Sequence, residues 1–143
     1  MYKQITIDGI DYNLVPVECS AILKHEKSKP KFKIGDSYLN GIVAYIDETG
    51  EHGLVCAKAD YFEELNWHDA MKIFENTSWR LPTKEELYIL YKNKDMLGGF
   101  ATYYYWSSSE GFNNGVWSQY FYNGLQSYLN KSNTYYVRAV RAF

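Results

Sequence analysis

The chain has 143 residues, with 15 Lys and Arg against 17 Asp and Glu, and a formal net charge of −2. This length suits one domain that can bury a hydrophobic core without disulfides or a structural metal. The charge balance provides no basic stripe to neutralise phosphates, so we expect no nucleic-acid partner. Cys19 and Cys56 lack metal-ligand or redox spacing, so we predict two small buried residues and no metal site or cofactor.

The start of the chain, MYKQITIDG, has no basic segment followed by an apolar run. No stretch approaches the roughly 20 apolar residues of a membrane helix. We therefore expect no signal peptide and no membrane insertion. The location stays open between a virus particle and the cytoplasm before assembly.

Residues 1–33 are predicted to be an N-terminal β-hairpin and a Lys-rich linker. Apolar residues such as Ile5, Ile7 and Ile10 alternate with polar ones around Asp8-Gly9, a type I′ turn signal. The run KHEKSKPKFK, residues 24–33, reads as a solvated linker. The hairpin has a free edge strand, so a homo-oligomer or a structural partner in a virion is a further expectation.

The main domain is predicted over residues 34–143. GIVAYIDETGEHGLVCA contains two short apolar strands around a turn at residues 47–50. Asn66 is a helix N-cap in NWHDAMKIFEN, and Thr83 and Glu86 have capping-box spacing in LPTKEELYILYKNK. Gly98-Gly99 ends this helical region, and strands and loops follow. The pattern predicts an α+β fold with two helices and irregular antiparallel strands.

Catalytic motifs are weak. His68-Asp69 lies on a helix where neighbours point in different directions, and the serines at 107–109 lack a GxSxG elbow. Serine hydroxyls in such a run bond to local backbone, and we expect them to pin an irregular loop. No enzymatic activity is predicted.

Asn123-Gly124 is a strong two-residue hairpin signal. A tight turn there pairs Tyr122 with Leu125, Tyr120 with Ser127 and Ser118 with Leu129. The opposite face carries Trp117 and Phe121, whose large apolar area assigns it to the core, with Gln119 and Gln126 bracing nearby loops. The predicted outward face consists of Ser118, Tyr120, Tyr122, Leu125, Ser127 and Leu129.

A surface rich in Tyr, Ser, Asn and Gly has the composition of an antibody paratope, in which tyrosine supplies rigid amphipathic contact area. The alternative is an ordinary solvent-facing hairpin of a Tyr-rich protein. Composition alone does not separate the two interpretations.

The segments GIVAYIDETGEHGLV, WRLPTKEEL, YWSSSE and YVRAVRAF, in this order, resemble bacterial and phage domains with the C-type-lectin-like fold, in the branch related to formylglycine-generating enzyme. The resemblance covers about three-quarters of the chain and leaves the N-terminal hairpin outside. The tail is most similar to variable proteins of diversity-generating retroelements, in which adenine mutagenesis converts AAY codons to NNY. NNY codons cannot encode Trp, Gln, Lys, Glu or Met.

The resemblance implies a ligand-binding variable region over about residues 102–136. Residues of the excluded types stand isolated there as framework positions: Trp106, Glu110, Trp117, Gln119, Gln126 and Lys131. The implied ligand-binding residues are Thr102, Tyr103, Tyr104, Gly111, Phe112, Asn113, Gly115, Ser118, Tyr120, Tyr122, Leu125, Ser127, Leu129, Ser132, Asn133, Thr134 and Tyr135.

Two departures narrow what the resemblance implies. Cys19 and Cys56 lie away from the C-terminal region that carries the catalytic cysteines of the enzyme, and the calcium-binding Glu-Pro-Asn or Gln-Pro-Asp triplets of sugar-binding lectins are absent. The expected function is therefore recognition of a protein or cell-surface ligand, encoded by a phage or prophage. The alternative is a non-diversified adhesin or polysaccharide-binding domain of the same fold.

Overall fold

The computed structural model describes residues 3–7, 10–14 and 31–143, and these form the predicted α+β fold. Strands β1 (Lys3–Ile7) and β2 (Ile10–Leu14) pair antiparallel with Ile7 opposite Ile10, so the predicted N-terminal hairpin is confirmed. The turn residues Asp8 and Gly9, Cys19, and the linker up to residue 30 lie outside the described residues.

A four-stranded antiparallel sheet forms the base of the domain, in the order β3-β4-β5-β9. Its strands are β3 (Ser37–Tyr38), β4 (Gly41–Ile46), β5 (Gly53–Ala57) and β9 (Val140–Ala142). The predicted turn between β4 and β5 is closed by the Asp47 carboxylate, which accepts bonds from the N–H groups of Thr49 and Gly50. Because β9 joins β5, the end of the chain completes a sheet begun a hundred residues earlier.

Three helices are described, one more than predicted: α1 (Trp67–Lys72), α2 (Lys84–Lys92) and α3 (Lys94–Leu97). Both predicted N-caps are confirmed. The Asn66 side chain accepts from the Asp69 N–H, and Thr83 and Glu86 form a reciprocal capping box. Within the part of the chain that the structure describes, no helix has the length and apolar character needed to span a membrane.

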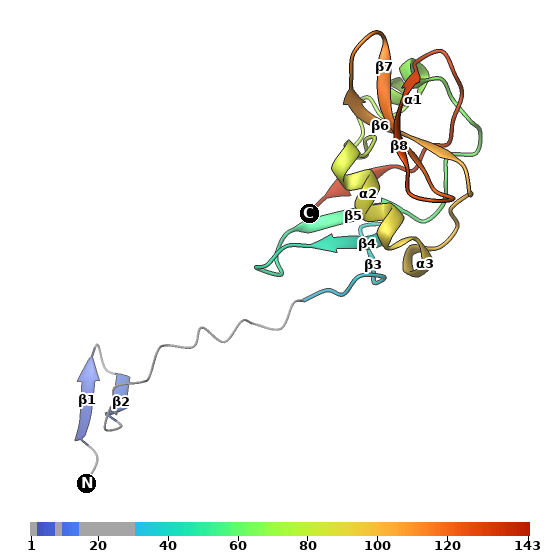
Figure 1. Cartoon of the computed structure of the whole chain (residues 1–143). Coiled ribbons are helices and arrows are strands. Elements are labelled where there is room, and N and C mark those ends of the chain that lie inside the picture. Colours follow the sequence, from blue (N-terminus) through green and yellow to red (C-terminus); the bar gives the residue numbers. More distant parts are fainter. Residues whose placement is uncertain (1–2, 8–9, 15–30) are drawn as a thin grey trace.

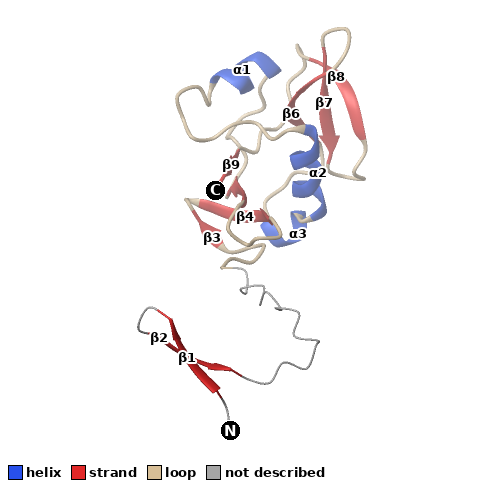
Figure 2. Cartoon of the chain, turned by 90° about the vertical axis from the view of Figure 1, so that its left-hand side faces the viewer, coloured by secondary structure: helices blue, strands red, loops and turns tan. Residues whose placement is uncertain are grey.

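The second sheet of the domain has the order β6-β7-β8, with β6 (Tyr104–Glu110), β7 (Gly115–Tyr120) and β8 (Gln126–Asn130). Helix α2 lies between this sheet and the base sheet (Figure 1). The view in Figure 2 shows α1 at the same end of the domain as β6–β8. Leu87 and Leu90 of α2 are buried in one cluster with Tyr105 and Phe121, so one face of the second sheet packs on this helix.

A buried ionic network ties the C-terminal segment to both halves of the core. Arg138 is fully buried and pairs with Asp60 through Nε at 2.6 Å, while its remaining donors bond to the carbonyls of residues 57, 98 and 99. The Tyr105 hydroxyl donates to Asp60 at 2.6 Å. Burial and the adjacent Asp60 raise the pKa of Tyr105, which keeps this hydroxyl protonated. The network positions the start of β6.

The serine run belongs to strand β6, which corrects the prediction of an irregular loop. Its hydroxyls do bond to backbone, as expected: Ser107 donates to the Trp117 carbonyl, and Ser109 accepts from the Lys84 N–H. A register shift between Trp106 and Glu110 accommodates these bonds. The serine run is a strand because β6 pairs antiparallel with β7, a pairing that the sequence pattern did not indicate.

The predicted register of the last hairpin is wrong by two residues. Ser118 pairs with Ser127 and Gln119 with Gln126, so four residues, 121–124, form the loop. The reason is Phe121, which leaves the ladder with β8, buries its ring in the core and donates its N–H to the Tyr103 carbonyl. Gly124 adopts φ +82° in this loop, a conformation that L side chains rarely take. Because side chains alternate with a period of two, a register shift of two residues leaves the same side chains together on each face.

Candidate functional site

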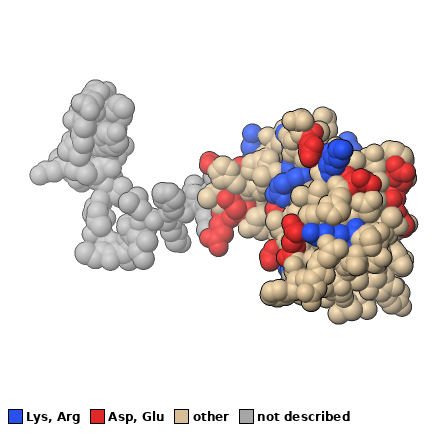
Figure 3. Space-filling view, turned by 90° about the horizontal axis from the view of Figure 1, so that it is seen from above, with Lys and Arg blue, Asp and Glu red and all other residues tan. Residues whose placement is uncertain are grey.

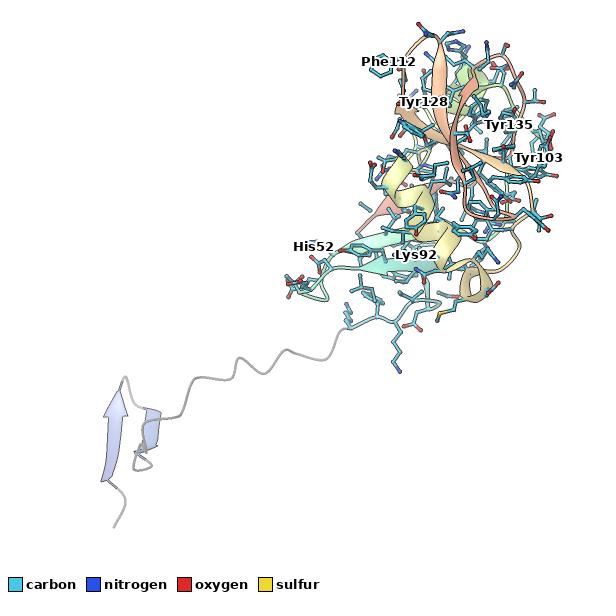
Figure 4. The ribbon with its side chains drawn as sticks, in the orientation of Figure 1. His52, Lys92, Tyr103, Phe112, Tyr128 and Tyr135 are labelled. Atoms are coloured by element: carbon cyan, nitrogen blue, oxygen red, sulfur yellow. The ribbon has the colours of Figure 1, made fainter. Side chains whose placement is uncertain are left out.

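Five tyrosines predicted as ligand contacts come together at one end of the β6–β7–β8 sheet. We call them the tyrosine surface: Tyr103, Tyr104, Tyr120, Tyr122 and Tyr135. Tyr104 and Tyr120 are directly opposite in the β6–β7 register. The C-terminal segment runs beside β6, because the Tyr136 N–H donates to the Tyr104 carbonyl and the Tyr136 carbonyl accepts from the Trp106 N–H. Figure 4 shows Tyr103 and Tyr135 close together as a result.

The rings of the tyrosine surface form one contiguous cluster. Tyr104 stacks on Tyr120 with a centroid distance of 4.5 Å and an interplanar angle of 23°. Tyr103 lies 6.1 Å from Tyr120, and Tyr135 lies 5.3 Å from Tyr104. Tyr122 extends the cluster 6.0 Å beyond Tyr120. Tyr122 is 71 % exposed and Tyr103 46 %, so the cluster offers accessible aromatic area on a half-buried support.

The sequence around this cluster is nearly free of charge. Between residues 102 and 136 the only charged residues are Glu110 and Lys131. They form an ion pair with each other at 2.6 Å, so neither charge is available alone. In the view from above, charged side chains gather on part of the visible face and leave a broad uncharged area (Figure 3). Residues 102–136 therefore contribute aromatic area and neutral hydrogen-bonding groups to this surface. The exposed carboxylates of Glu63 and Glu64 come from outside this range and precede Leu65, whose backbone bonds to Tyr135.

Polar side chains border the tyrosine surface. Asn133 donates its amide to the Tyr135 hydroxyl at 3.1 Å. Partial burial raises the pKa of Tyr135, so its hydroxyl remains a neutral donor and acceptor. Thr102, Ser132, Asn133 and Thr134 are exposed. Ser132 bonds to Asn130 within the loop, and the hydroxyls of Thr102 and Thr134 remain at the surface.

The outward hairpin face is only partly as predicted. Tyr122 and Leu125 are exposed, and Tyr120, Ser127 and Leu129 are half-buried. The prediction that Ser118 faces outward is wrong, since its side chain is 1 % exposed. The face is covered at the Ser118 end by the cluster of Trp106, Val116 and Val137 under α1, and Leu129 packs against that cluster. Only the end near Tyr120 is left open.

The predicted contacts at the β6–β7 turn lie away from the tyrosine surface. Figure 4 shows Phe112 far from Tyr103, since Phe112 follows β6 and Tyr103 precedes it. Phe112 is 83 % exposed and Asn113 is exposed, whereas Gly115 is buried. A Cβ on Gly111 would lie 1.8 Å from the Tyr128 ring. A larger residue in place of Gly111 or Gly115 would therefore have to displace the Tyr128 ring or the turn before it could contact a ligand.

Sequence reasoning missed a pair of aromatic rings on the face of the sheet opposite Ser118 and Tyr120. The ring centroids of Tyr128 and Trp117 are 3.8 Å apart, and Lys84 Nζ lies 3.4 Å from the centroid of the Trp117 ring. Trp117 is predicted on the core face, and Tyr128, which pairs with it, shares that face. That face is buried where α2 covers it, but α2 begins at Lys84, and beyond it Tyr128 is 45 % exposed. Strand alternation identifies a face and cannot show where its cover ends.

The two framework glutamines behave differently. Gln126 donates to the Lys84 carbonyl at 3.0 Å and so braces the start of α2, as predicted. Gln119 is fully buried, and neither atom of its amide has a hydrogen-bond partner among the described residues. The predicted brace is therefore present for Gln126 and is not found for Gln119 among the described residues. Cys56, in contrast, is buried as predicted, and burial raises the pKa of its thiol.

A polar pocket of about 440 Å³ lies beside the loop that contains Ser132. Its lining comes from α1 with its N-cap and from the two neighbouring turns at one end of the sheet: Asn66, His68, Asp69, Asn114, Lys131 and Ser132. Lys131 is held there by Glu110 and by the Trp67 ring 4.5 Å below it. Among the predicted contact residues, Ser132 lines this pocket.

Comparison with protein families gives a match over most of the chain. The family model described as the Lcl C-terminal domain matches residues 20–141, which include all three helices and the strands from β3 to β8 and reach into β9. No curated protein matches the sequence. Since the match covers most of the chain, this protein belongs to the Lcl C-terminal domain family.

Proposed function

We propose that this protein binds a protein or cell-surface ligand through the tyrosine surface and performs no catalysis. The observation that carries the proposal is the convergence of five tyrosines from three separate segments into one accessible cluster. Tyrosine supplies large contact area at a low cost in conformational entropy, and bordering Asn, Ser and Thr side chains supply adaptable hydrogen bonds. Membership of the Lcl C-terminal domain family is consistent with a ligand-binding protein.

We further propose that the domain has the C-type-lectin-like fold and that a retroelement carried by a phage or prophage diversifies its tail. The six isolated residues of excluded codon types support this, because Trp106, Gln126 and Lys131 hold the scaffold through burial, a hydrogen bond to the start of α2 and an ion pair, respectively. The buried Ser118 and Gly115 narrow the diversified surface to positions that reach solvent.

Binding through the tyrosine surface is tested by selection from a phage-displayed library of random linear peptides on the immobilised protein. Tyr103→Ser should weaken the selected peptides by about tenfold or more, as for an aromatic hot spot. The matched control is Tyr45→Ser on β4, where the tyrosine is 43 % exposed against 46 % for Tyr103. Equal losses in the two variants would refute the proposal.

Diversification is tested separately on the coding DNA. The codons of the exposed positions should end in C or T, with a near-copy template repeat and a reverse-transcriptase gene close by. Codons ending in A or G, without such a template, would instead support a non-diversified adhesin. A glycan array read with and without calcium distinguishes a polysaccharide target from a protein target.

A further inference from the structure

One edge of the β6–β7–β8 sheet is open, and the other is closed. Beside β6, the segment around Tyr136 bonds to Tyr104 and Trp106 and covers that edge. Strand β8 is the last strand on the opposite side, and among the described residues it pairs with β7 alone. The sheet therefore ends in the five residues Gln126–Asn130.

The ladder determines which backbone groups of β8 point outward. The Tyr120 N–H bonds to the Leu125 carbonyl, and the Lys131 N–H bonds to the Asn114 carbonyl. Because bonded and non-bonded pairs alternate in an antiparallel ladder, the N–H and C=O groups of Gln126 and Tyr128 point away from β7. Among the described residues, no hydrogen bond is made to these groups.

The usual protections of an edge strand are missing from β8. Proteins block strand edges with lysine, proline, bulges or a covering segment. The sequence QSYLN has no charge and no proline, and its register with β7 runs without a shift over five pairs. Exposed apolar side chains flank the edge on both faces, with Leu125 53 % exposed on one and Tyr128 45 % on the other.

We propose that the ligand is a polypeptide that adds to β8 as an extended strand. This inference rests on the proposed function and names the ligand class and its mode of binding. Unpaired backbone donors and acceptors at strand spacing are complementary to another extended backbone. The side chains of the added strand would alternate between the Leu125 and Ser127 side, which borders Tyr120, and the Tyr128 side, which borders Trp117.

This mode of binding suits a surface whose side chains are replaced. Main-chain hydrogen bonds do not depend on side-chain identity, whereas the flanking pockets give specificity. Replacing Leu125 or Ser127 would change which peptide is accepted and leave the strand ladder in place. Gln126 and Trp117 are of types that NNY codons cannot encode, so the support of the edge would stay constant.

The test compares Tyr128→Pro with Tyr128→Ala, using linear peptides selected on the unmodified protein. Both variants lose the tyrosine ring, but only proline removes the outward N–H and obstructs an approaching strand. Tyr128→Pro should bind the peptides at least about tenfold more weakly than Tyr128→Ala. Equal affinities would overturn strand addition.

Two further measurements keep the proposal testable if Tyr128→Pro does not fold. In the unmodified protein, the peptide should slow hydrogen exchange of the Gln126 and Tyr128 amides, whereas the Ser127 amide is already protected by β7. N-methylation along the peptide should abolish binding at alternate residues only. Unchanged exchange of the Tyr128 amide, or tolerance of every N-methyl group, would overturn strand addition.

The outcomes separate this proposal from the function on which it rests. Loss of binding in Tyr103→Ser with equal binding in the two Tyr128 variants retains the tyrosine surface and removes strand addition. Failure to select any linear peptide counts against strand addition, while binding to other targets that depends on Tyr103 still supports the proposed function. Concentration-dependent dimers that Tyr128→Pro abolishes would show that a second copy of the chain occupies the edge, and would overturn a foreign polypeptide as its occupant.

Discussion

Tyr104 and Tyr120 stand directly opposite each other on β6 and β7, and their rings stack at 4.5 Å. This pair is the centre of the tyrosine surface, because Tyr103, Tyr122 and Tyr135 each lie within about 6 Å of one of its rings. Its support is the strand ladder itself, so its geometry survives changes in the surrounding loops.

Removal of an exposed ring should separate binding from stability. Tyr122→Ser takes away a side chain that is 71 % exposed, so the free energy of unfolding should change by less than about 0.5 kcal/mol. The affinity for selected peptides should fall several-fold or more, because the ring is part of the contact cluster. Urea unfolding and titration calorimetry measure the two quantities; a large loss of stability would contradict a contact role.

Binding through the tyrosine surface should depend little on salt. Glu110 and Lys131 are the only charges between residues 102 and 136, and they neutralise each other. The affinity for a selected peptide should change less than about threefold between about 0.05 and 0.5 M NaCl, since screening acts only on charges. A steep decline with salt, measured by calorimetry, would show that charges outside this surface carry the binding.

The buried Arg138 should be essential for stability. Arg138→Met leaves Asp60 without its ionic partner and leaves three carbonyls without a donor, so we expect a loss of about 3–5 kcal/mol. Adding Asp60→Asn should recover part of this loss, because the uncompensated carboxylate is removed. Chemical denaturation of the single and double variants checks the expectation, and strictly additive losses would argue against a coupled pair.

The two framework glutamines should respond in opposite directions to the same substitution. Gln119→Met replaces a buried amide without a partner, so the protein should gain about 1 kcal/mol. Gln126→Met removes the donor to the Lys84 carbonyl and should cost about 1 kcal/mol. Thermal unfolding of the two variants provides the comparison, and destabilisation by Gln119→Met would reveal a polar partner that holds the amide.

The Glu86 carboxylate should make stability depend on acid pH. Burial tends to raise the pKa of Glu86, but hydrogen bonds from Arg80 and Thr83 outweigh it and hold the pKa below 4.5. A depressed pKa contributes stability that is present above 4.5 and lost as the pH falls through the folded value. Glu86→Gln should cost about 0.5–1 kcal/mol at pH 7, and the difference from the unmodified protein should vanish once the pH has fallen below the folded pKa of Glu86.

The control for this pH dependence is Glu85→Gln, which changes an exposed carboxylate in the same first turn of α2. It should cost little at any pH, since an exposed charge near a helix N-terminus contributes only tenths of a kcal/mol. Denaturant unfolding at several pH values measures both variants. An equal pH dependence would assign the effect to the helix dipole rather than to the Arg80 pair.

Local features were predictable from the sequence because neighbouring residues create them. Asn66, Thr83 and Glu86 cap their helices through bonds that span only three residues. Ile7 and Ile10 pair across a two-residue connection, and Asp47 closes a turn with its own successors. The residue types that form the tyrosine surface were also identified, since a cluster of tyrosines among small polar residues is a property of composition.

The tertiary structure decided what covers each face. Ser118 and Tyr120 share a face, yet one is buried under the Trp106 cluster and the other borders solvent. Tyr128 and Gln119 share the opposite face, and α2 covers only Gln119. Strand alternation depends on the backbone alone, whereas burial depends on where distant segments lie. The sequence by itself determined the elements and the character of the surface; packing of α1, α2 and the C-terminal segment decided its extent.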